Sequence, residues 1–119
     1  MAFRADRSAS APRLARQAVR EWLASVRCPD RLSADALLVV SELLTNAVVH
    51  ARSEATIVAS FDDGRLRVEV HDGDLTPPRL SDQPDASGGW GLRLVAALAD
   101  RWGWILTSSG KRVWAELLC

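Results

Sequence analysis

The chain has 119 residues, of which 48% are hydrophobic and 25% are charged, and its formal net charge at pH 7 is zero. These values are typical of one globular domain and exclude a disordered chain, and the zero net charge disfavours binding of nucleic acid or anionic membrane through overall charge. Cys28 and Cys119 have no metal-ligand spacing, and no secretory signal or membrane-length apolar run is present. We therefore expect a reduced, cytoplasmic compartment.

Residues 1–11 are predicted to form a flexible lead-in or a short strand, and residues 12–119 a single domain. The Arg- and Ala-rich start also fits a transit peptide, but it continues without a break into a patterned helix, which favours a domain element. This helix is predicted to begin at Pro12 and to end before Pro29. Its apolar face is predicted to contain Leu14, Ala18, Trp22 and Val26.

A second, strongly apolar helix is predicted between Ser33, which would cap it, and Ala51. Glu42, Asn46 and His50 recur every four residues, so they form one polar row on this helix. Burying a carboxylate and an amide without partners costs several kcal/mol, so either core groups satisfy them or a ligand does. A carboxylate beside an amide oxygen suits Mg²⁺, whereas His50 is expected to cap the helix or line the surface.

After the second helix the hydrophobic pattern changes from helical to alternating. Strands are predicted at residues 56–61 and 65–71, joined by a hairpin turn at Asp62-Asp63-Gly64. Since side chains alternate along a strand, Asp72 shares the face of Val70. The Asp72 carboxylate is therefore predicted to point toward the covered side of the sheet.

Residues 73–89 are rich in Gly, Asp, Pro and Ser and are predicted to form a long loop, whose length favours a functional lid. The loop leads through Gly88-Gly89-Trp90-Gly91 into a short helix that includes Leu92. Strands at 102–107 and 112–118 are predicted to complete the chain. Hairpin-joined strands with helices gathered on one side predict an α+β fold, a two-layer α/β sandwich with a mostly antiparallel, mixed sheet.

Three of these features fit the parts of a nucleoside triphosphate. Asp72 would accept a hydrogen bond from an exocyclic amine of a base, and Asn46 would hold a Mg²⁺ ion that bridges phosphates. The glycines before the short helix would present backbone N–H groups to the phosphates. These glycines match neither the dinucleotide fingerprint nor the Walker motif, and the alternative is that they only end a loop.

The motifs resemble those of the GHKL ATP-binding superfamily, and within it the chain looks most like the anti-sigma-factor serine/threonine kinases and their single-domain actinobacterial relatives. The resemblance covers residues 12–118 and implies a Bergerat-type fold that binds ATP and Mg²⁺ beneath a lid. It rests on ELLTNAVVHA (residues 42–51), VEVHDGD (68–74), GGWGLRLVAALADRWGW (88–104) and GKRVWAEL (110–117).

Carried over residue by residue, the resemblance implies that Asn46 binds magnesium, Glu42 is the general base and Asp72 contacts the adenine amino group. The positions implied at the nucleotide also include glycines and one leucine: Gly73, Gly88, Gly89, Gly91 and Leu92. In the family the aspartate is followed by x-Gly-x-Gly, but here it is followed by Gly73-Asp74-Leu75-Thr76. The acid at Asp74 weighs against tight phosphate binding and turnover, but leaves adenine recognition unaffected.

The sequence leaves two functions open. The resemblance implies an anti-sigma regulatory kinase that phosphorylates a serine or threonine of an anti-sigma antagonist and controls sigma-factor availability, with Glu42 as base. The alternative is a non-catalytic nucleotide-binding or partner-docking module, favoured by Asp74 and the short lid. A histidine-kinase catalytic domain is less expected, because no phosphoacceptor helix precedes the domain. The expected partners are ATP, a sigma factor and an antagonist, without nucleic acid or membrane; a homodimer is left open.

Overall fold

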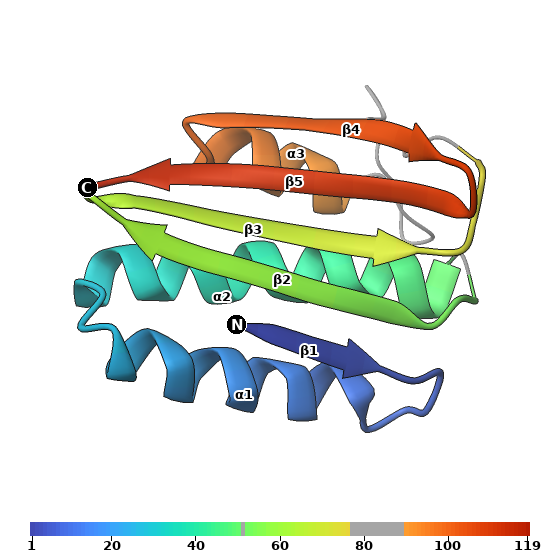
Figure 1. Ribbon diagram of the computed structural model, residues 1–119, viewed down its shortest axis with the longest axis horizontal. Helices are drawn as coiled ribbons and strands as arrows, with labels where there is room; N and C mark the ends of the chain where they lie inside the picture. The colour runs from blue at the N-terminus through green and yellow to red at the C-terminus, as the bar shows by residue number, and fades with distance from the viewer. Residues whose placement is uncertain (51, 77–89) are drawn as a thin grey trace.

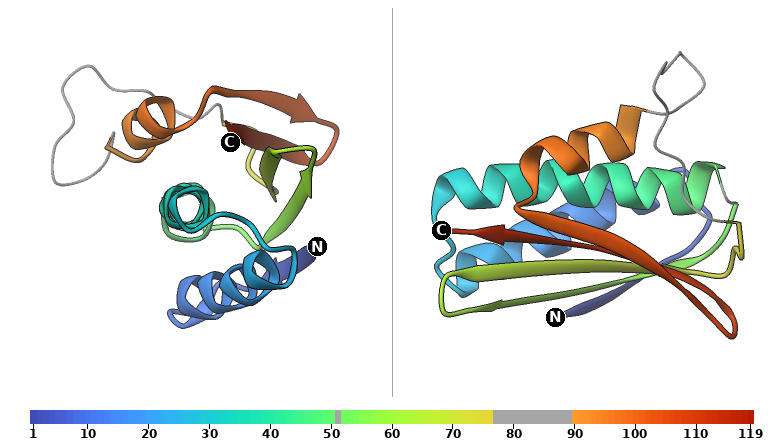
Figure 2. Two further views of the ribbon diagram at one scale, coloured as in Figure 1. Left: turned by 90° about the vertical axis from the view of Figure 1, so that its left-hand side faces the viewer. Right: turned by 90° about the horizontal axis from the view of Figure 1, so that it is seen from above.

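The computed structural model describes residues 1–50, 52–76 and 90–119, in which three α-helices cover one face of a five-stranded sheet (Figure 1). The strand order is β1-β2-β3-β5-β4, and every neighbouring pair is antiparallel. Figure 2 shows the two layers, with α2 between α1 and α3. The predicted α+β two-layer sandwich is confirmed, but its sheet is entirely antiparallel rather than mixed. The elements are β1 (Ala2–Ala5), α1 (Ala11–Ser25), α2 (Asp30–Thr45), the π-helical turn η1 (Asn46–His50), β2 (Ala55–Asp62), β3 (Arg65–Asp72), α3 (Trp90–Leu98), β4 (Arg101–Thr107) and β5 (Gly110–Leu118).

Helix α1 buries a row of residues one position away from the predicted face. The buried side chains repeat every four residues: Ala11, Ala15, Val19 and Leu23. Leu14, which was expected on the buried face, is exposed, and Trp22 is only partly buried. The two rows are adjacent on the helix, about 100° apart, and both are largely apolar. The position of β1 and α2 decides which row faces the core.

Helix α2 begins earlier than predicted and ends in a different helical form. It starts at Asp30, after Pro29, and the Ser33 hydroxyl does not cap it but lies 3.4 Å from the carbonyl oxygen of Cys28. The carboxylate of Asp30, in the first turn, interacts favourably with the positive end of the helix dipole. This interaction compensates for the missing side-chain cap. After Thr45 the helix widens into η1. Such π-turns interrupt helices at functional sites more often than elsewhere.

The central hairpin follows from its turn residues. Asp63 and Gly64 have positive φ values of 55° and 74°, as a two-residue turn of this hand requires. Strand β3 therefore places Leu66, Val68 and Val70 on the buried face, where they pack beneath the helices. Apart from boundary shifts of one or two residues, the four predicted strands occur where the sequence places them, and of the two alternatives for residues 1–11 the short strand is present, at residues 2–5.

The sheet face turned away from the helices carries an ion-pair network centred on Arg67. The Arg67 guanidinium donates to Glu69 at 3.0 Å and to Glu116 at 2.9 Å, and its carbon lies 4.5 Å from the centre of the Trp114 ring. A Cβ added at Gly103 would lie 2.9 Å from the same ring, so this glycine leaves room for Trp114. These cross-strand contacts stabilise the pairing of β3, β5 and β4.

Residues that are distant in sequence meet at one end of the sheet. Strand β3 ends at Asp72 and β5 starts beside it, because the register pairs Asp72 with Lys111. The C-terminal end of α2 and the turn η1 contact the same end of β3, at the right of Figure 1. Helix α3 starts on this side and runs back toward the opposite end (Figure 2, right). We refer to this region as the Asp72 end.

Within the described residues, none of the helices combines the length and the apolar character needed to cross a membrane.

Candidate functional site

Asp72 is a buried acid that faces the helices, as its parity with Val70 predicts. Its side chain is 3% exposed, and it is paired with Lys111, whose side chain is 7% exposed. The Lys111 Nζ lies 3.1 Å from Oδ1 and 3.0 Å from Oδ2 of Asp72. Because the two residues lie directly opposite each other in the β3–β5 ladder, the backbone register itself brings the charges together.

The Asp72 carboxylate keeps one acceptor position that no described residue fills. A carboxylate offers about four lone-pair sites, two on each oxygen. Oδ1 accepts from the backbone N–H of Asp74 at 2.9 Å and from Lys111, whereas Oδ2 contacts Lys111 only. The second site on Oδ2 is therefore available to a donor from outside, such as the amino group of a nucleobase.

Asp74 is the partly exposed neighbour of this pair. Its side chain is 30% exposed, and its Oδ2 lies 3.7 Å from the Lys111 Nζ. The backbone N–H of Thr76 donates to its Oδ1 at 2.9 Å, and this hydrogen bond, together with Lys111, lowers the pKa of Asp74. Asp74 is therefore ionised at neutral pH, and part of its charge is offset by Lys111.

The backbone around Asp72 is packed too closely for a side chain. A Cβ added at Gly110 would lie 1.8 Å from the carbonyl oxygen of Asp72 and 2.8 Å from the Cα of Gly73. The N–H of Gly73 donates to the Ser53 hydroxyl at 2.7 Å. This N–H is therefore already used, so Gly73 contributes to the site by close packing rather than by a free donor.

Glu42 and Asn46 lie one helical turn apart at the Asp72 end, but they are half-buried rather than fully buried. Leu38, one turn before Glu42 on the same side of α2, is 47% exposed. Glu42 and Asn46 therefore follow the least covered side of α2. The expectation that these two side chains are fully buried is wrong, because water can reach them.

The donor set at this end fits a magnesium ion that is held mainly by phosphates and water. No hydrogen bond or ion pair joins the side chain of Glu42 or of Asn46 to another described residue, so both keep their oxygens available. In the described part of the chain, no group of three or more His, Cys, Asp or Glu side chains could hold a metal by itself. Mg²⁺ commonly binds one or two protein oxygens and keeps the rest of its shell for substrate and water.

The glycine positions are only partly described. Gly88, Gly89 and most of the predicted lid, residues 77–89, lie outside the described residues. Helix α3 begins at Trp90, directly after these glycines, and Gly91 lies in its first turn. Leu92 is buried in the core, so only its backbone is available to a phosphate.

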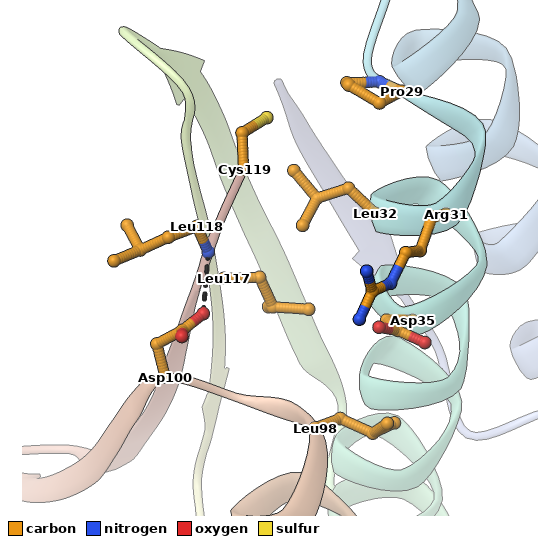
Figure 3. A pocket seen from close by; sticks show the side chains of 9 residues that line it. All are labelled: Pro29, Arg31, Leu32, Asp35, Leu98, Asp100, Leu117, Leu118 and Cys119. Carbon is orange, nitrogen blue, oxygen red and sulfur yellow. Dashed lines mark hydrogen bonds between the residues drawn. The ribbon is translucent and has the colours of Figure 1, made fainter.

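A separate hollow of about 370 Å³ lies at the opposite end of the sheet (Figure 3). It lies between the first turns of α2 and the last residues of the chain, and Asp100 there accepts a hydrogen bond from the N–H of Leu118 at 2.8 Å. Strand β5 separates it from Lys111 by roughly 20–25 Å at about 3.3 Å per residue. The hollow is therefore not part of the Asp72 end.

The sequence interpretation missed Lys111 and Ser53. Lys111 lies just outside the predicted strand at residues 112–118, but β5 begins at Gly110 and includes it. Its parity with Val113, which is buried, is the signal that would have placed Lys111 on the inner face. Ser53 gives no such signal, because its contact with Gly73 depends on how the chain returns after η1.

Residues 4–117 match the family described as the histidine kinase-like ATPase domain. A solved structure of the RsbU and RsbW domains of a Mycobacterium tuberculosis protein is similar over part of its length, with a TM-score of 0.76 and 24% identity over 99% of this chain and 31% of that chain. A chain of the SiaB–SiaC complex from Pseudomonas aeruginosa gives a TM-score of 0.69 and 14% identity over 100% of this chain and 88% of that one. At these identities the likeness shows the fold alone, and this chain spans less than a third of the first structure's length. No curated protein is significantly similar in sequence.

Proposed function

The chain belongs to the histidine kinase-like ATPase domain family, and from this premise we propose that it binds ATP with Mg²⁺ at the Asp72 end and transfers a phosphoryl group to a serine or threonine of a protein partner. The observation that carries the proposal is the buried Asp72 carboxylate, which keeps an unfilled acceptor site on Oδ2. The lone pair that Lys111 leaves open on this oxygen can accept a hydrogen bond from a second donor. The amino group of adenine is such a donor.

Each proposed contact uses a group that the described residues leave available. Asp72 would hold the base, and the Asn46 amide oxygen would bind the metal. Glu42, one turn earlier on α2, would orient the partner's hydroxyl and accept its proton. When bound, ATP supplies the phosphoryl group, and Mg²⁺ offsets the charge that develops on the phosphates.

The partner side of the proposal rests on the resemblance and on the kinds of protein that share the fold. The two similar structures contain an RsbW domain beside an RsbU domain, and SiaB in complex with SiaC. We propose that this chain acts as an anti-sigma regulator in the cytoplasm, with a sigma factor and an anti-sigma antagonist as its partners. In that setting phosphorylation of the antagonist would control how much sigma factor is available.

A second function is favoured by Lys111 and Asp74. Lys111 already contacts both oxygens of Asp72, and Asp74 adds a negative charge beside the pair. The negative charge of Asp74 would reduce the affinity for phosphates, and Lys111 occupies acceptor positions of Asp72. Together they would leave a module that binds nucleotide, or docks a partner, without catalysis. Melting temperature with and without ATP and Mg²⁺ tests binding, because a ligand of the native state raises it.

The test of catalysis is phosphate transfer to candidate antagonists encoded next to this gene, followed by mass spectrometry. We expect Glu42→Ala to reduce transfer by about 10²–10⁴-fold, while nucleotide affinity stays nearly unchanged. Glu21→Ala is the matched control, since Glu21 is an exposed glutamate on α1. An equal loss of affinity and transfer in Glu42→Ala would refute the role of Glu42, and binding without any transfer would favour the non-catalytic module.

A further inference from the structure

Lys111 is the only lysine in the chain, and it is placed inside the protein rather than on its surface. It lies on the helix-facing side of β5, in the row that continues with Val113, Ala115 and Leu117. Lysine is rarely buried unless its charge is paired, and Asp72 supplies that pairing. A salt bridge made only for stability would gain little over apolar side chains of the same size. Stability alone therefore does not account for the position of this pair at the Asp72 end, and we looked for a role of Lys111 in ligand binding.

One N–H group of the Lys111 ammonium makes no hydrogen bond to a described residue. The ammonium carries three N–H groups. The two oxygens of Asp72 occupy at most two of them, and Asp74 Oδ2 at 3.7 Å is too far for a hydrogen bond. Among the described residues no other acceptor hydrogen-bonds to this nitrogen. A buried ammonium thus presents an unused N–H beside a carboxylate that presents an unused lone pair.

We propose that Lys111 is a second nucleobase contact, which donates a hydrogen bond to N1 of adenine while Asp72 accepts one from the 6-amino group. This inference rests on the proposed nucleotide binding at Asp72. In adenine the amino donor and the N1 acceptor are adjacent on one edge. The Asp72–Lys111 pair offers the complementary acceptor and donor side by side, 3.0 Å apart.

The same pair would discriminate against guanine in this orientation. Guanine presents a carbonyl oxygen where adenine has its amino group, and an N–H where adenine has N1. The carbonyl would face the Asp72 carboxylate and the N–H would face the Lys111 ammonium, so neither contact forms. A site built to hydrogen-bond one edge rejects the mismatched edge strongly, because its buried polar groups are left unpaired.

Calorimetric titration of the wild-type protein with ADP, 1-deaza-ADP, 7-deaza-ADP and GDP, each with Mg²⁺, tests this inference. 1-Deaza-ADP replaces N1 by C–H and keeps the amino group, and we expect it to bind about 10- to 100-fold more weakly than ADP. 7-Deaza-ADP is the matched control, since its change lies away from this edge, and should bind like ADP. GDP should bind at least as weakly as 1-deaza-ADP.

The variant Lys111→Met completes the test. If Lys111 contacts N1, this variant should bind ADP and 1-deaza-ADP equally well. Equal affinity of the wild-type protein for the two nucleotides, or GDP binding as tight as ADP binding, would overturn the inference even if the variant does not fold, and would leave the proposed nucleotide binding intact. No binding of ADP to the wild-type protein at millimolar concentration would refute both.

Discussion

Breaking the buried ion pair from either side should destabilise the fold far more than breaking a surface pair. The side chains of Asp72 and Lys111 are 3% and 7% exposed, so replacing one leaves the other as a buried, uncompensated charge. Removing one member of such a pair typically costs about 3–5 kcal/mol. Asp72 would keep the Asp74 N–H, and Lys111 would keep Asp74 at 3.7 Å, which favours the lower end. We therefore expect Lys111→Met and Asp72→Asn each to lower the free energy of unfolding by about 3 kcal/mol.

The double variant separates the pair interaction from the two side chains. With both charges removed, neither is left unpaired, so the loss should be about 3 kcal/mol or less rather than the sum of roughly 6 kcal/mol. Arg4→Met is the matched control, because the Arg4–Glu54 pair is largely exposed and should contribute less than about 1 kcal/mol.

Urea denaturation at neutral pH, followed by tryptophan fluorescence, measures these differences as shifts in midpoint at constant slope. Single variants that lose less than 1 kcal/mol would contradict the burial of the pair. Additive losses in the double variant would contradict the direct contact between the two side chains.

Three further outcomes follow from the contacts. Gly110→Ala should lower the free energy of unfolding, measured by urea denaturation, by about 1–3 kcal/mol, because its Cβ would clash with the backbone of Asp72. The same clash should weaken nucleotide binding. Gly103→Ala should lower the free energy of unfolding less, because its Cβ would meet a side chain that can move. Burial raises the pKa of Glu69, but hydrogen bonds from Arg67 and His71 outweigh this effect and hold the pKa below its ordinary value. The ionised carboxylate therefore stabilises the fold at neutral pH, and this stabilisation is lost as the pH falls into the acidic range where the folded form is protonated. The urea midpoint of Glu69→Gln should therefore decline less than that of the wild-type protein between pH 5 and pH 3. Asn46→Ala should bind ATP equally in Mg²⁺ and in EDTA, unlike the wild-type protein and the neighbouring variant Thr45→Ala, and a retained magnesium dependence would exclude Asn46 as the ligand.

Local patterns were sufficient for the secondary structure because each depends on neighbours along the chain. The Asp63-Gly64 turn, the period of two in β3 and the helical spacing in α1 and α2 are properties of short segments. The errors arose where two solutions are locally equivalent. Helix α1 has two adjacent apolar rows, and only the elements packed on it decide which row is buried.

The candidate site was predicted unevenly for the same reason. Asp72 was placed correctly because strand parity fixes the face of every side chain. Glu42 and Asn46 were expected to be buried because α2 is apolar, but the exposure of Leu38 shows that its neighbours leave one side open. Whether they act as base and metal ligand stays a prediction, as do the roles of the glycines at 88 and 89.

Periodicity and turn chemistry were enough to predict the two-layer α+β fold, the order of its elements and the inward direction of the Asp72 carboxylate, because these patterns depend on a few neighbouring residues. The pairing of Lys111 with this carboxylate emerges from the packing of the whole chain, since residues 39 positions apart are joined by the β3–β5 register. The same packing also decided how far Glu42 and Asn46 are covered. Burial and charge pairing depend on which surfaces meet, and that is a property of the packed chain rather than of any one segment.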